Sequence, residues 1–284
     1  MTEKSETWTT LKVLNWTKSY LAEKGVENAR LEAEWLLCAA LNLDRVGLYL
    51  NFDKPLLDSE LAAYRSMVAR RAKREPLQHI LGSQEFMGLD FDVSPSALVP
   101  RYDTEVLVNE TLKRAAPQAR VLDIGTGSGC VAIAIAKSLP AATVVSVDVS
   151  QNALSLARQN SDKFAAKVDF RHGSLFEPVA DECFNLIVSN PPYIPTADIA
   201  GLEPEVREFE PLDALDGGSD GLDFYRKIVC EAPSHLTSQG WLVFEVGIGQ
   251  AADVANLLQE AGFGGIFTAV DSGGVERVVG GQFA

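Results

Sequence analysis

The chain has 284 residues, of which 46% are apolar and 23% charged, a composition typical of globular proteins with one large or two ordinary domains. Its net charge is −14. Residues 1–100 contain 12 Lys+Arg and 14 Asp+Glu, whereas the other 184 residues contain 13 Lys+Arg and 25 Asp+Glu, so most of the negative charge lies in the second part. Phosphate binding needs cations, so this balance disfavours nucleic acid as the direct ligand. No apolar run reaches the roughly 18 residues of a membrane span.

The amino terminus and the cysteines indicate the cellular compartment. Residues 1–6 contain acids and lack the basic and apolar regions of a targeting peptide. Cys38, Cys130, Cys183 and Cys230 are scattered, with no CxxC spacing and no nearby histidine. Free thiols in a reducing cytosol fit this pattern better than disulfides or zinc. We therefore expect a cytoplasmic protein without a metal site.

The first 80 or so residues predict helices. Leu31, Trp35 and Cys38 fall on one helical face at i, i+4 and i+7. Residues 58–60 can cap a second helix that runs to the basic cluster 70–74, before Pro76. Cations suit the carboxyl end of a helix dipole, so a solvated helix end explains this cluster better than a partner-docking patch.

Residues 85–93 alternate around a glycine, which predicts a short hairpin and places a domain boundary there. We expect a helical domain at 1–84, a β-hairpin linker at 85–100 and a catalytic domain at 101–284. From residue 101 strands and helices alternate, as in a parallel, doubly wound α/β sheet. The expected strands are 121–125, 143–148, 168–171, 184–189, 241–246, 266–270 and 276–281. The expected helices are 103–114, 129–138, 151–160, 222–235 and 250–261.

A glycine-rich loop follows the first of these strands. Gly125-Thr126-Gly127-Ser128-Gly129 predicts a tight turn into a helix, where a ligand can approach the backbone closely. Cys130 stands where a GxGxxG dinucleotide fingerprint needs its last glycine, which argues against a nicotinamide dehydrogenase. The GxGxG spacing is similar to the loop of S-adenosylmethionine-dependent methyltransferases.

Further side chains at strand ends complete a candidate adenosyl-ligand site. Asp148, 23 residues after Gly125, can accept hydrogen bonds from both ribose hydroxyls. Leu175 can cover an adenine face and Ser174 can bond its edge, although Leu175 and Phe176 can equally be core residues. Asp123 either holds the ligand's amino-acid end or hydrogen-bonds the loop. The predicted cofactor-binding residues are Gly125, Thr126, Gly127, Ser128, Gly129, Asp148, Leu175 and Asn190.

The tetrapeptide Asn190-Pro191-Pro192-Tyr193 follows the apolar run 184–189. Prolines leave their carbonyls free as acceptors, and Pro191 biases Asn190 to an extended conformation. Asn190 Oδ1 and the Pro191 carbonyl can then accept the two protons of a planar –NH2 group, with Tyr193 packed against it. The alternative is a turn that merely ends a strand. We predict Asn190 and Pro191 as catalytic, and Asn190, Pro191, Pro192 and Tyr193 as substrate-binding residues.

With these pieces in order the chain resembles the peptide chain release factor glutamine methyltransferases, the HemK/PrmC family. The matching segments are residues 74–82, 99–105, 125–129, 190–193 and 215–225. Two positions depart from the family pattern: Tyr102 replaces a common proline, and Ser174 replaces a usual acid.

The resemblance implies a class I, Rossmann-like, seven-stranded methyltransferase domain behind a small helical domain. It implies methyl transfer from S-adenosyl-L-methionine, leaving S-adenosyl-L-homocysteine, to the side-chain amide nitrogen (N5) of a glutamine. That glutamine belongs to the Gly-Gly-Gln (GGQ) loop of release factors, which the helical domain would help to dock. We expect a monomer that contacts neither a membrane nor nucleic acid directly.

Several residues keep open roles. Arg101, Asp103, Thr104 and Glu105 can line the cofactor pocket, although helix capping explains Asp103 as well. Glu245 fits a strand-end acid better than a substrate contact. Residues 194–221 predict a flap over the peptide entrance, or a disordered segment. The chemistry needs no histidine base, so His79, His172 and His235 are expected to be structural.

Three other functions are compatible with parts of this sequence. A ribosomal-protein glutamine methyltransferase would have the same pocket and a different amino-terminal domain. A DNA or RNA exocyclic-amine methyltransferase would flip its base and carry a basic region, which the charge disfavours. A non-enzymatic adaptor would not need residues 190–193. Gly280-Gly281-Gln282 repeats the target tripeptide, and chance explains it better than self-modification.

Overall fold

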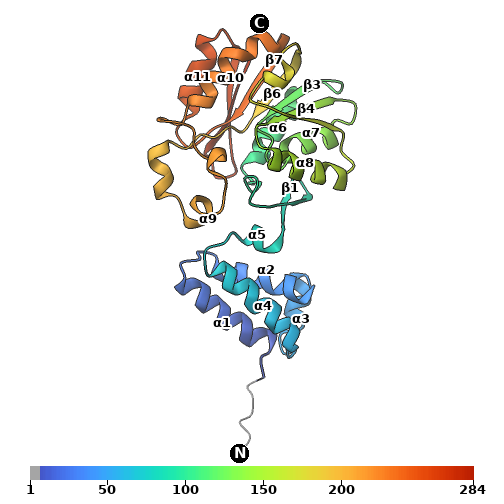
Figure 1. Cartoon of the computed structure of the whole chain (residues 1–284), viewed down its shortest axis with the longest axis vertical. Helices are drawn as coiled ribbons and strands as arrows, with labels where there is room; N and C mark the ends of the chain where they lie inside the picture. The colour runs from blue at the N-terminus through green and yellow to red at the C-terminus, as the bar shows by residue number, and fades with distance from the viewer. Residues whose placement is uncertain (1–6) are drawn as a thin grey trace, which may run out of the picture. The chain divides into compact units, whose positions relative to one another are not determined.

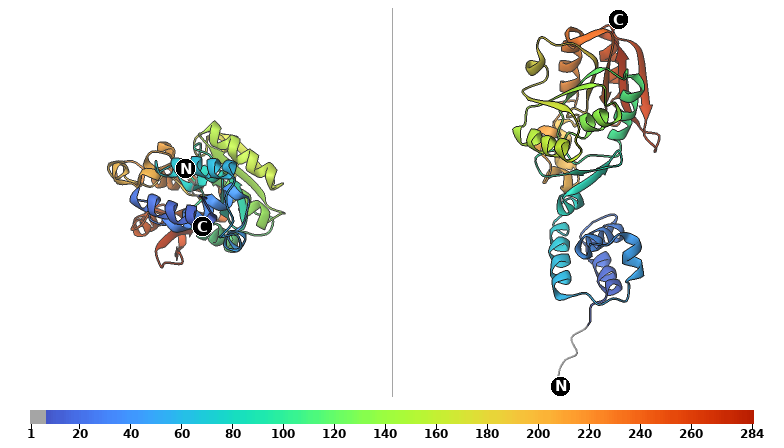
Figure 2. Two further views of the ribbon diagram at one scale, coloured as in Figure 1. Left: turned by 90° about the horizontal axis from the view of Figure 1, so that it is seen from below. Right: turned by 90° about the vertical axis from the view of Figure 1, so that its right-hand side faces the viewer.

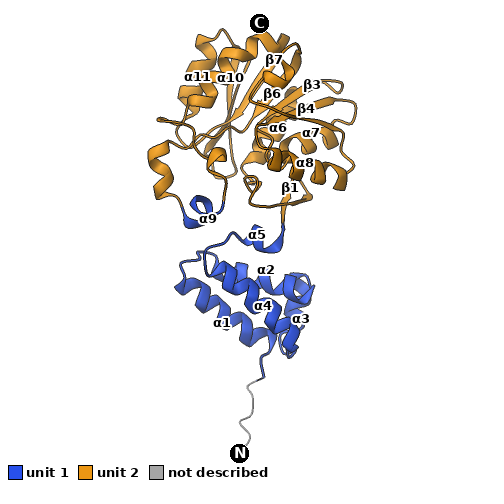
Figure 3. Cartoon of the chain, in the orientation of Figure 1, with its two compact units in different colours: residues 1–82, 203–209 blue, residues 83–202, 210–284 orange. Residues whose placement is uncertain are grey.

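The computed structural model describes residues 7–284; residues 1–6, where no targeting peptide was expected, lie outside the described part. The chain forms two compact units (Figure 3). Unit 1 ends at Gly82 and also takes in Glu203–Phe209, whereas unit 2 comprises Ser83–Leu202 and Glu210–Ala284. No sequence pattern predicts that residues 203–209 belong with the helices, and the expected domain limits at 84 and 101 stay a prediction.

Unit 1 is helical, as expected. Its helices are α1 Thr10–Glu23, α2 Ala29–Leu41, α3 Arg45–Leu50, α4 Asp58–Arg71, α5 Leu77–Leu81 and α9 Pro204–Arg207. Leu36 and Leu37 of α2 are fully buried in its core, beside Tyr64 of α4. Trp35 and Leu31 are 44% and 42% exposed. Their spacing predicted the helix α2 correctly, but these two side chains lie on its outer side.

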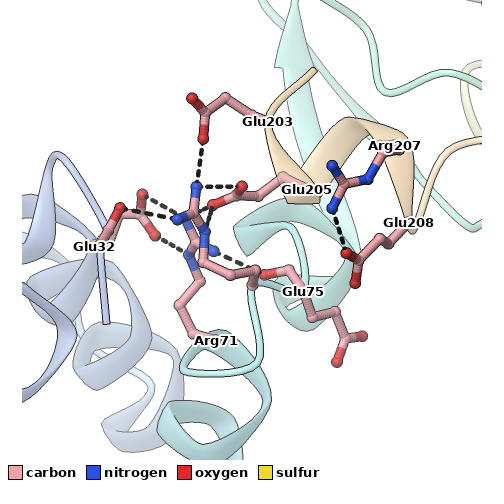
Figure 4. Close-up of polar contacts among 9 residues, drawn as sticks. Glu32, Arg71, Glu75, Glu203, Glu205, Arg207 and Glu208 are labelled. Carbon is pink, nitrogen blue, oxygen red and sulfur yellow. Dashed lines mark hydrogen bonds and ion pairs between the residues drawn. The ribbon is translucent and has the colours of Figure 1, made fainter. Parts of the chain in front are cut away.

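In the basic cluster at the end of α4, Arg70 and Lys73 are exposed, as a solvated helix end predicts, but that interpretation is wrong for Arg71 and Arg74. Arg71 is only 5% exposed and pairs with Glu32 and, at 2.8 Å, with Glu205 (Figure 4). Arg74 pairs with Glu203 at 2.7 Å and with Glu205 at 2.6 Å. Burial would raise the pKa of Glu205, but the bonds from Arg74 and Arg71 outweigh it and lower the pKa. Carboxylates from distant parts of the chain therefore take the place of water around these guanidinium groups.

A hairpin opens unit 2, as the alternating pattern predicted. Strands β1 Ser83–Phe86 and β2 Leu89–Asp92 pair antiparallel. Met87 and Gly88 between them have φ of 51° and 72°, as a two-residue type I′ turn requires. The Glu105 carboxylate, at the start of the following helix, accepts a 2.7 Å bond from the Met87 N–H. This bond ties the hairpin to the helix that follows it within unit 2.

Unit 2 contains the expected seven-stranded, Rossmann-like sheet, with strand order β5-β4-β3-β6-β7-β9-β8. The strands are β3 Arg120–Ile124, β4 Thr143–Asp148, β5 Val168–His172, β6 Phe184–Ser189, β7 Leu236–Glu245, β8 Gly264–Val270 and β9 Glu276–Gln282. Strand β9 runs antiparallel to both neighbours, so the otherwise parallel sheet is mixed at this edge. Only residues 271–275 join β8 to β9, too few for the crossover that a parallel pair needs.

Helices lie on both sides of this sheet (Figure 1 and Figure 2). They are α6 Thr104–Arg114, α7 Cys130–Ser138, α8 Gln151–Lys163, α10 Asp223–Glu231 and α11 Ala251–Glu260. One core forms beneath α6 and α7 and another beneath α10 and α11, with Val121 of β3 in the first and Leu122 in the second. Helix α10 ends before the expected residue 235 because Pro233 cannot continue the hydrogen-bond ladder.

Short 3₁₀ turns complete the unit: η1 Glu177–Val179, η2 Thr196–Gly201, η3 Leu212–Ala214 and η4 Ala232–His235. The region 194–221 is therefore built from short helical turns, and a bridge between Ile194 and Asp216 closes it at its base. Within the described residues, no helix could cross a bilayer. Because β3, β4 and β6 run parallel, their carboxyl ends meet at one edge of the sheet, where such folds bind ligands.

Candidate active site

A cavity of about 370 Å³ opens at the carboxyl ends of β3, β4 and β6, within the size range of small-molecule sites. It brings together most of the residues expected to bind cofactor or substrate. Those that line it are Gly125, Thr126, Gly127, Ser128, Asp148, Leu175, Asn190, Pro191 and Pro192. Their separate positions in the sequence converge because each follows a strand whose end reaches this edge.

The glycine loop serves two purposes. Gly125 has φ of 79°, and a Cβ added there would meet no atom within 4 Å, so this backbone borders open space. Gly129 does not line the cavity, unlike the expectation that it binds cofactor. A Cβ on Gly129 would come within 3.0 Å of both Ala157 and Ile133. Gly125 thus leaves room for a ligand, whereas Gly129 allows α7 to begin close against α8.

Asp148 ties the end of β4 to the loop. Its Oδ2 accepts from the Gly127 N–H at 2.8 Å, and its Oδ1 accepts from the Ser150 N–H at 2.8 Å. Each carboxylate oxygen has a further lone pair, so Asp148 can still accept bonds from ligand hydroxyls. The side chain therefore shapes the loop and offers acceptors to the cavity at once.

Asp123 is buried beneath the loop, only 1% exposed, and is not among the cavity-lining residues. Ser146 on the neighbouring strand donates to Asp123 Oδ2 at 2.8 Å. Burial raises the pKa of Asp123 to about 6. The side-chain bond of Asp123 is therefore to the neighbouring strand rather than to the glycine loop, and its place outside the cavity lining does not favour direct contact with a ligand.

Leu175 and Phe176 separate into a cavity residue and a core residue. Leu175 borders the cavity with φ of 49°, a left-handed conformation that costs an L-residue about 1–2 kcal/mol. Phe176 is buried and stacks on His235, with ring centroids 4.5 Å apart. The strained backbone turns the Leu175 side chain to the cavity while its neighbour stays in the core.

In the tetrapeptide after β6, Asn190 donates from Nδ2 to Thr104 Oγ1 at 3.4 Å. Pro191 is buried against the cavity. Tyr193 does not border the cavity, contrary to the idea that its ring lies behind the substrate; it packs against the core beneath α10 and α11. Burial, then the charge of Glu245, raises the pKa of Tyr193 to about 12.

The linker residues divide in the same way. Arg101 and Thr104 line the cavity, and Arg101 pairs with Glu210 at 2.5 Å. Asp103 precedes α6 but makes no capping bond with its side chain, and pairs instead with Arg277 at 2.8 Å. Glu105 supports the hairpin. Two of the four candidates therefore reach the cavity, and the other two hold the surrounding elements.

A buried acid lies beside this site, at the strand end where the sequence predicted it. Glu245, at the end of β7, is 2% exposed, and its Oε2 has no hydrogen-bond partner among residues 7–284. Burial raises the pKa of Glu245 to about 7, despite hydrogen bonds from Thr104 and Asn190. Strand register places Glu245 beside Asn190: Ser189 of β6 pairs with Phe244 of β7, and the next residues along the two chains are Asn190 and Glu245.

The remaining candidates lie away from the cavity. The three histidines are not among its lining residues in the described chain. Gly280 and Gly281 sit inside β9, where a Cβ would come 2.5 Å from Phe267 or 2.8 Å from Ile266. Gln282 donates to the Gln239 carbonyl at 3.0 Å. Close packing explains the glycines of this tripeptide without any self-modification.

Sheet order, glycine loop and cavity together define a class I methyltransferase. Residues 12–82 match the family described as PrmC N-terminal domain, and residues 102–200 match the methyltransferase small domain. A release factor glutamine methyltransferase of Geobacter sulfurreducens is 64% identical over 99% of both chains. One from Gloeobacter violaceus is 40% identical over 93% of this chain and 94% of its own. The chain belongs to the release factor glutamine methyltransferase family.

Among solved structures, a methyltransferase from Pyrococcus furiosus has a TM-score of 0.55 at 20% identity. It covers 75% of this chain and 98% of its own. At that identity the likeness establishes the fold alone, which agrees with the seven-stranded sheet.

Proposed function

We propose that the protein transfers a methyl group from S-adenosyl-L-methionine to the side-chain amide nitrogen (N5) of the glutamine in the GGQ loop of peptide chain release factors. The relative that is 64% identical along nearly the whole of both chains carries most of this proposal. The cavity-lining amide of Asn190 agrees with it, because the substrate group is itself a planar amide. Such a protein acts in translation termination, in the cytoplasm, and we expect it to do so as a monomer.

The cavity fits the adenosyl cofactor. Gly125 borders open space where a side chain would intrude, and the Gly125–Ser128 backbone would approach the cofactor's amino-acid end. Asp148 would accept bonds from the ribose hydroxyls, and Leu175 would cover the adenine. When bound, the cofactor supplies a methyl group on a positively charged sulfur and is released as S-adenosyl-L-homocysteine.

The protein's own residues must overcome the weakness of the nucleophile. An amide nitrogen reacts poorly because its lone pair is delocalised into the carbonyl. Asn190 Oδ1 and the Pro191 carbonyl would accept the two N–H bonds of the glutamine amide and hold its nitrogen in line for transfer. The same acceptors would stabilise the positive charge that grows on this nitrogen. The proton can leave afterwards to one of these oxygens or to water.

The defining experiment combines purified protein, isotope-labelled S-adenosyl-L-methionine and purified release factor. We expect one methyl group per factor, located on the GGQ glutamine by peptide mass spectrometry. A release factor with that glutamine changed to alanine is the matched control and should stay unlabelled. Label found only on ribosomal protein, or on nucleic acid, would replace this proposal with one of its rivals.

Changing Asp148 to alanine should weaken cofactor affinity about 10- to 100-fold, because a charged acceptor and the tie to Gly127 are both lost. Calorimetric titration with S-adenosyl-L-methionine measures this change. Asp181→Ala, at an exposed position of unit 2, is the matched control and should bind normally. An unchanged dissociation constant in Asp148→Ala would remove this residue from the cofactor site.

A further inference from the structure

Glu245 is a buried acid for which the chemistry above has no task. It ends β7 beside Asn190, and its carboxyl is almost fully shielded from water. Ionisable groups are rarely buried at this level unless they are paired, since desolvation of a charge is costly. Within the described residues no salt bridge to Glu245 is formed. We therefore ask what a carboxyl group with this desolvation cost does beside the substrate amide site.

The residues next to Glu245 indicate its role. The Asn190 carboxamide has two N–H donors on Nδ2, and one of them is given to Thr104 Oγ1 at 3.4 Å. Strand register sets Asn190 beside Glu245, because Ser189 of β6 pairs with Phe244 of β7 and these two residues come next. Interactions with Thr104 and Asn190 oppose the rise that burial causes in the pKa of the Glu245 carboxyl. The amino end of the Asn190 carboxamide therefore faces Thr104, and the Glu245 carboxyl is the neighbouring acceptor on the protein side.

An ionised carboxylate is an acceptor only, so it tolerates the amino end of a carboxamide and rejects the oxygen end. Thr104 alone would not discriminate, because a hydroxyl both donates and accepts. A carboxamide turned by half a rotation has nearly the same shape but presents donors where the substrate's own N–H groups must bind. The orientation of Asn190 thus depends on the acceptor-only group.

We propose that Glu245 is a positioning residue: its buried carboxylate holds Asn190 with Nδ2 inward, so that Oδ1 faces the cavity to receive the substrate –NH2. The inference rests on the proposed function of Asn190. It explains why an acid at the end of the strand next to β6 is enclosed rather than solvated.

The charges around Glu245 make the arrangement sensitive to pH. Arg277 lowers the pKa of Glu245, Asp103 raises it, and both residues are joined in an ion pair. Together with burial, the larger cause, the charge of Glu245 in turn raises the pKa of Tyr193, Tyr225 and Cys130, and the Tyr225 hydroxyl donates to the Glu245 backbone carbonyl at 2.9 Å. Burial dominates and brings the pKa of Glu245 to about 7.

The protonation state of Glu245 determines how turnover changes with pH. Above about pH 7 the carboxylate is ionised and accepts only, so Asn190 is held in the productive orientation. Below that pH the protonated carboxyl gains a donor, which can bond Oδ1 of a reversed Asn190 carboxamide. Turnover of the unaltered enzyme should therefore fall as the pH drops through about 7.

The test uses the full chain with release factor and labelled donor, at saturating concentrations of both. Glu245→Leu should lower kcat about 10- to 100-fold, since the amide is still present but is misoriented. Glu245→Gln, which can accept and also donate, should fall between this variant and the unaltered enzyme. In both variants donor affinity measured by calorimetry should stay within about threefold, and the fall in turnover below pH 7 should disappear. Glu260→Gln, exposed on α11, is the matched control.

A double-mutant cycle separates positioning from a merely structural role. If Glu245 acts through Asn190, then Glu245→Leu should cost nothing further in an Asn190→Ala background. Additive losses in the cycle, or a Glu245→Gln enzyme with the turnover and pH profile of the unaltered one, would overturn the inference. An unaltered enzyme that fails to methylate release factor would instead overturn the proposed function.

Discussion

Asn190→Ala is expected to lower turnover on release factor about 100- to 1,000-fold, the range seen when one stabilising hydrogen-bond group of an active site is removed. Alanine leaves only the Pro191 carbonyl to hold the substrate amide, so the nitrogen can rotate away from the transfer direction. Donor affinity should change by less than about threefold, because the loop and Asp148 remain intact. Initial rates with saturating donor, together with calorimetric titration, measure the two effects separately.

Asn256→Ala provides the comparison, since Asn256 is an exposed asparagine on α11 away from the cavity. It should match the unaltered enzyme in both measurements. A loss of donor affinity as large as the loss of turnover would show that Asn190 serves the cofactor rather than the substrate. Full activity in Asn190→Ala would remove the residue from the catalytic site altogether.

The sheet and the cavity could be predicted because their signals are local. Gly125 and Asp148 each follow an apolar run, and parallel strands bring their carboxyl ends to one edge whatever the connecting helices contain. The hairpin turn at Met87-Gly88 was equally readable, because glycine between two alternating segments is a short-range signal. These elements could be predicted because a few neighbouring residues determine their conformation.

Contacts between distant segments could not be predicted in that way. Arg71 and Glu205 are separated by 134 residues, and no sequence pattern around either residue predicts that the two are in contact. The segment 203–209 is acidic and lies in a region that reads as a surface flap, so its place beside Arg71 and Arg74 emerges only from the fold. The position of Glu245 beside Asn190 depends in the same way on a contact between strands, because it follows from the register of β6 against β7.

The region 194–221 shows how such contacts organise a segment of low periodicity. Its residues 203–209 belong to unit 1, whereas Pro211, Asp213 and Ala214, which follow directly, line the cavity of unit 2. Glu210 lies between them and is bonded to Arg101, another cavity residue. The ion pairs of Arg71 and Arg74 hold residues 203–209 within unit 1, whereas Pro211, Asp213 and Ala214 form part of the cavity wall within unit 2.

Arg71→Ala is expected to destabilise unit 1 by about 3–5 kcal/mol, because removing one partner of a buried ionic network leaves an uncompensated charge behind. Glu32, whose side chain is 16% exposed, would lose its guanidinium partner, whereas Glu205 would keep only its pair with Arg74. Urea unfolding followed by circular dichroism measures the loss. Limited proteolysis should also cut more readily at 203–209, which loses part of its attachment.

The same network sets a pH limit on stability. The pKa of Glu205 lies below its ordinary 4.5 in the folded protein, so the ionised form is the one that folding favours. Its contribution is therefore complete above the ordinary pKa and is lost as the pH falls through the lowered one. As the pH falls from about 5 through the lowered pKa of Glu205, Arg71→Ala should lose less stability than the unaltered protein. Arg65→Ala, exposed on the same helix, should change unfolding by no more than about 0.5 kcal/mol and keep the full pH dependence. Equal stability in Arg71→Ala and Arg65→Ala would mean that the buried guanidinium contributes nothing net, and that residues 203–209 are held by other contacts.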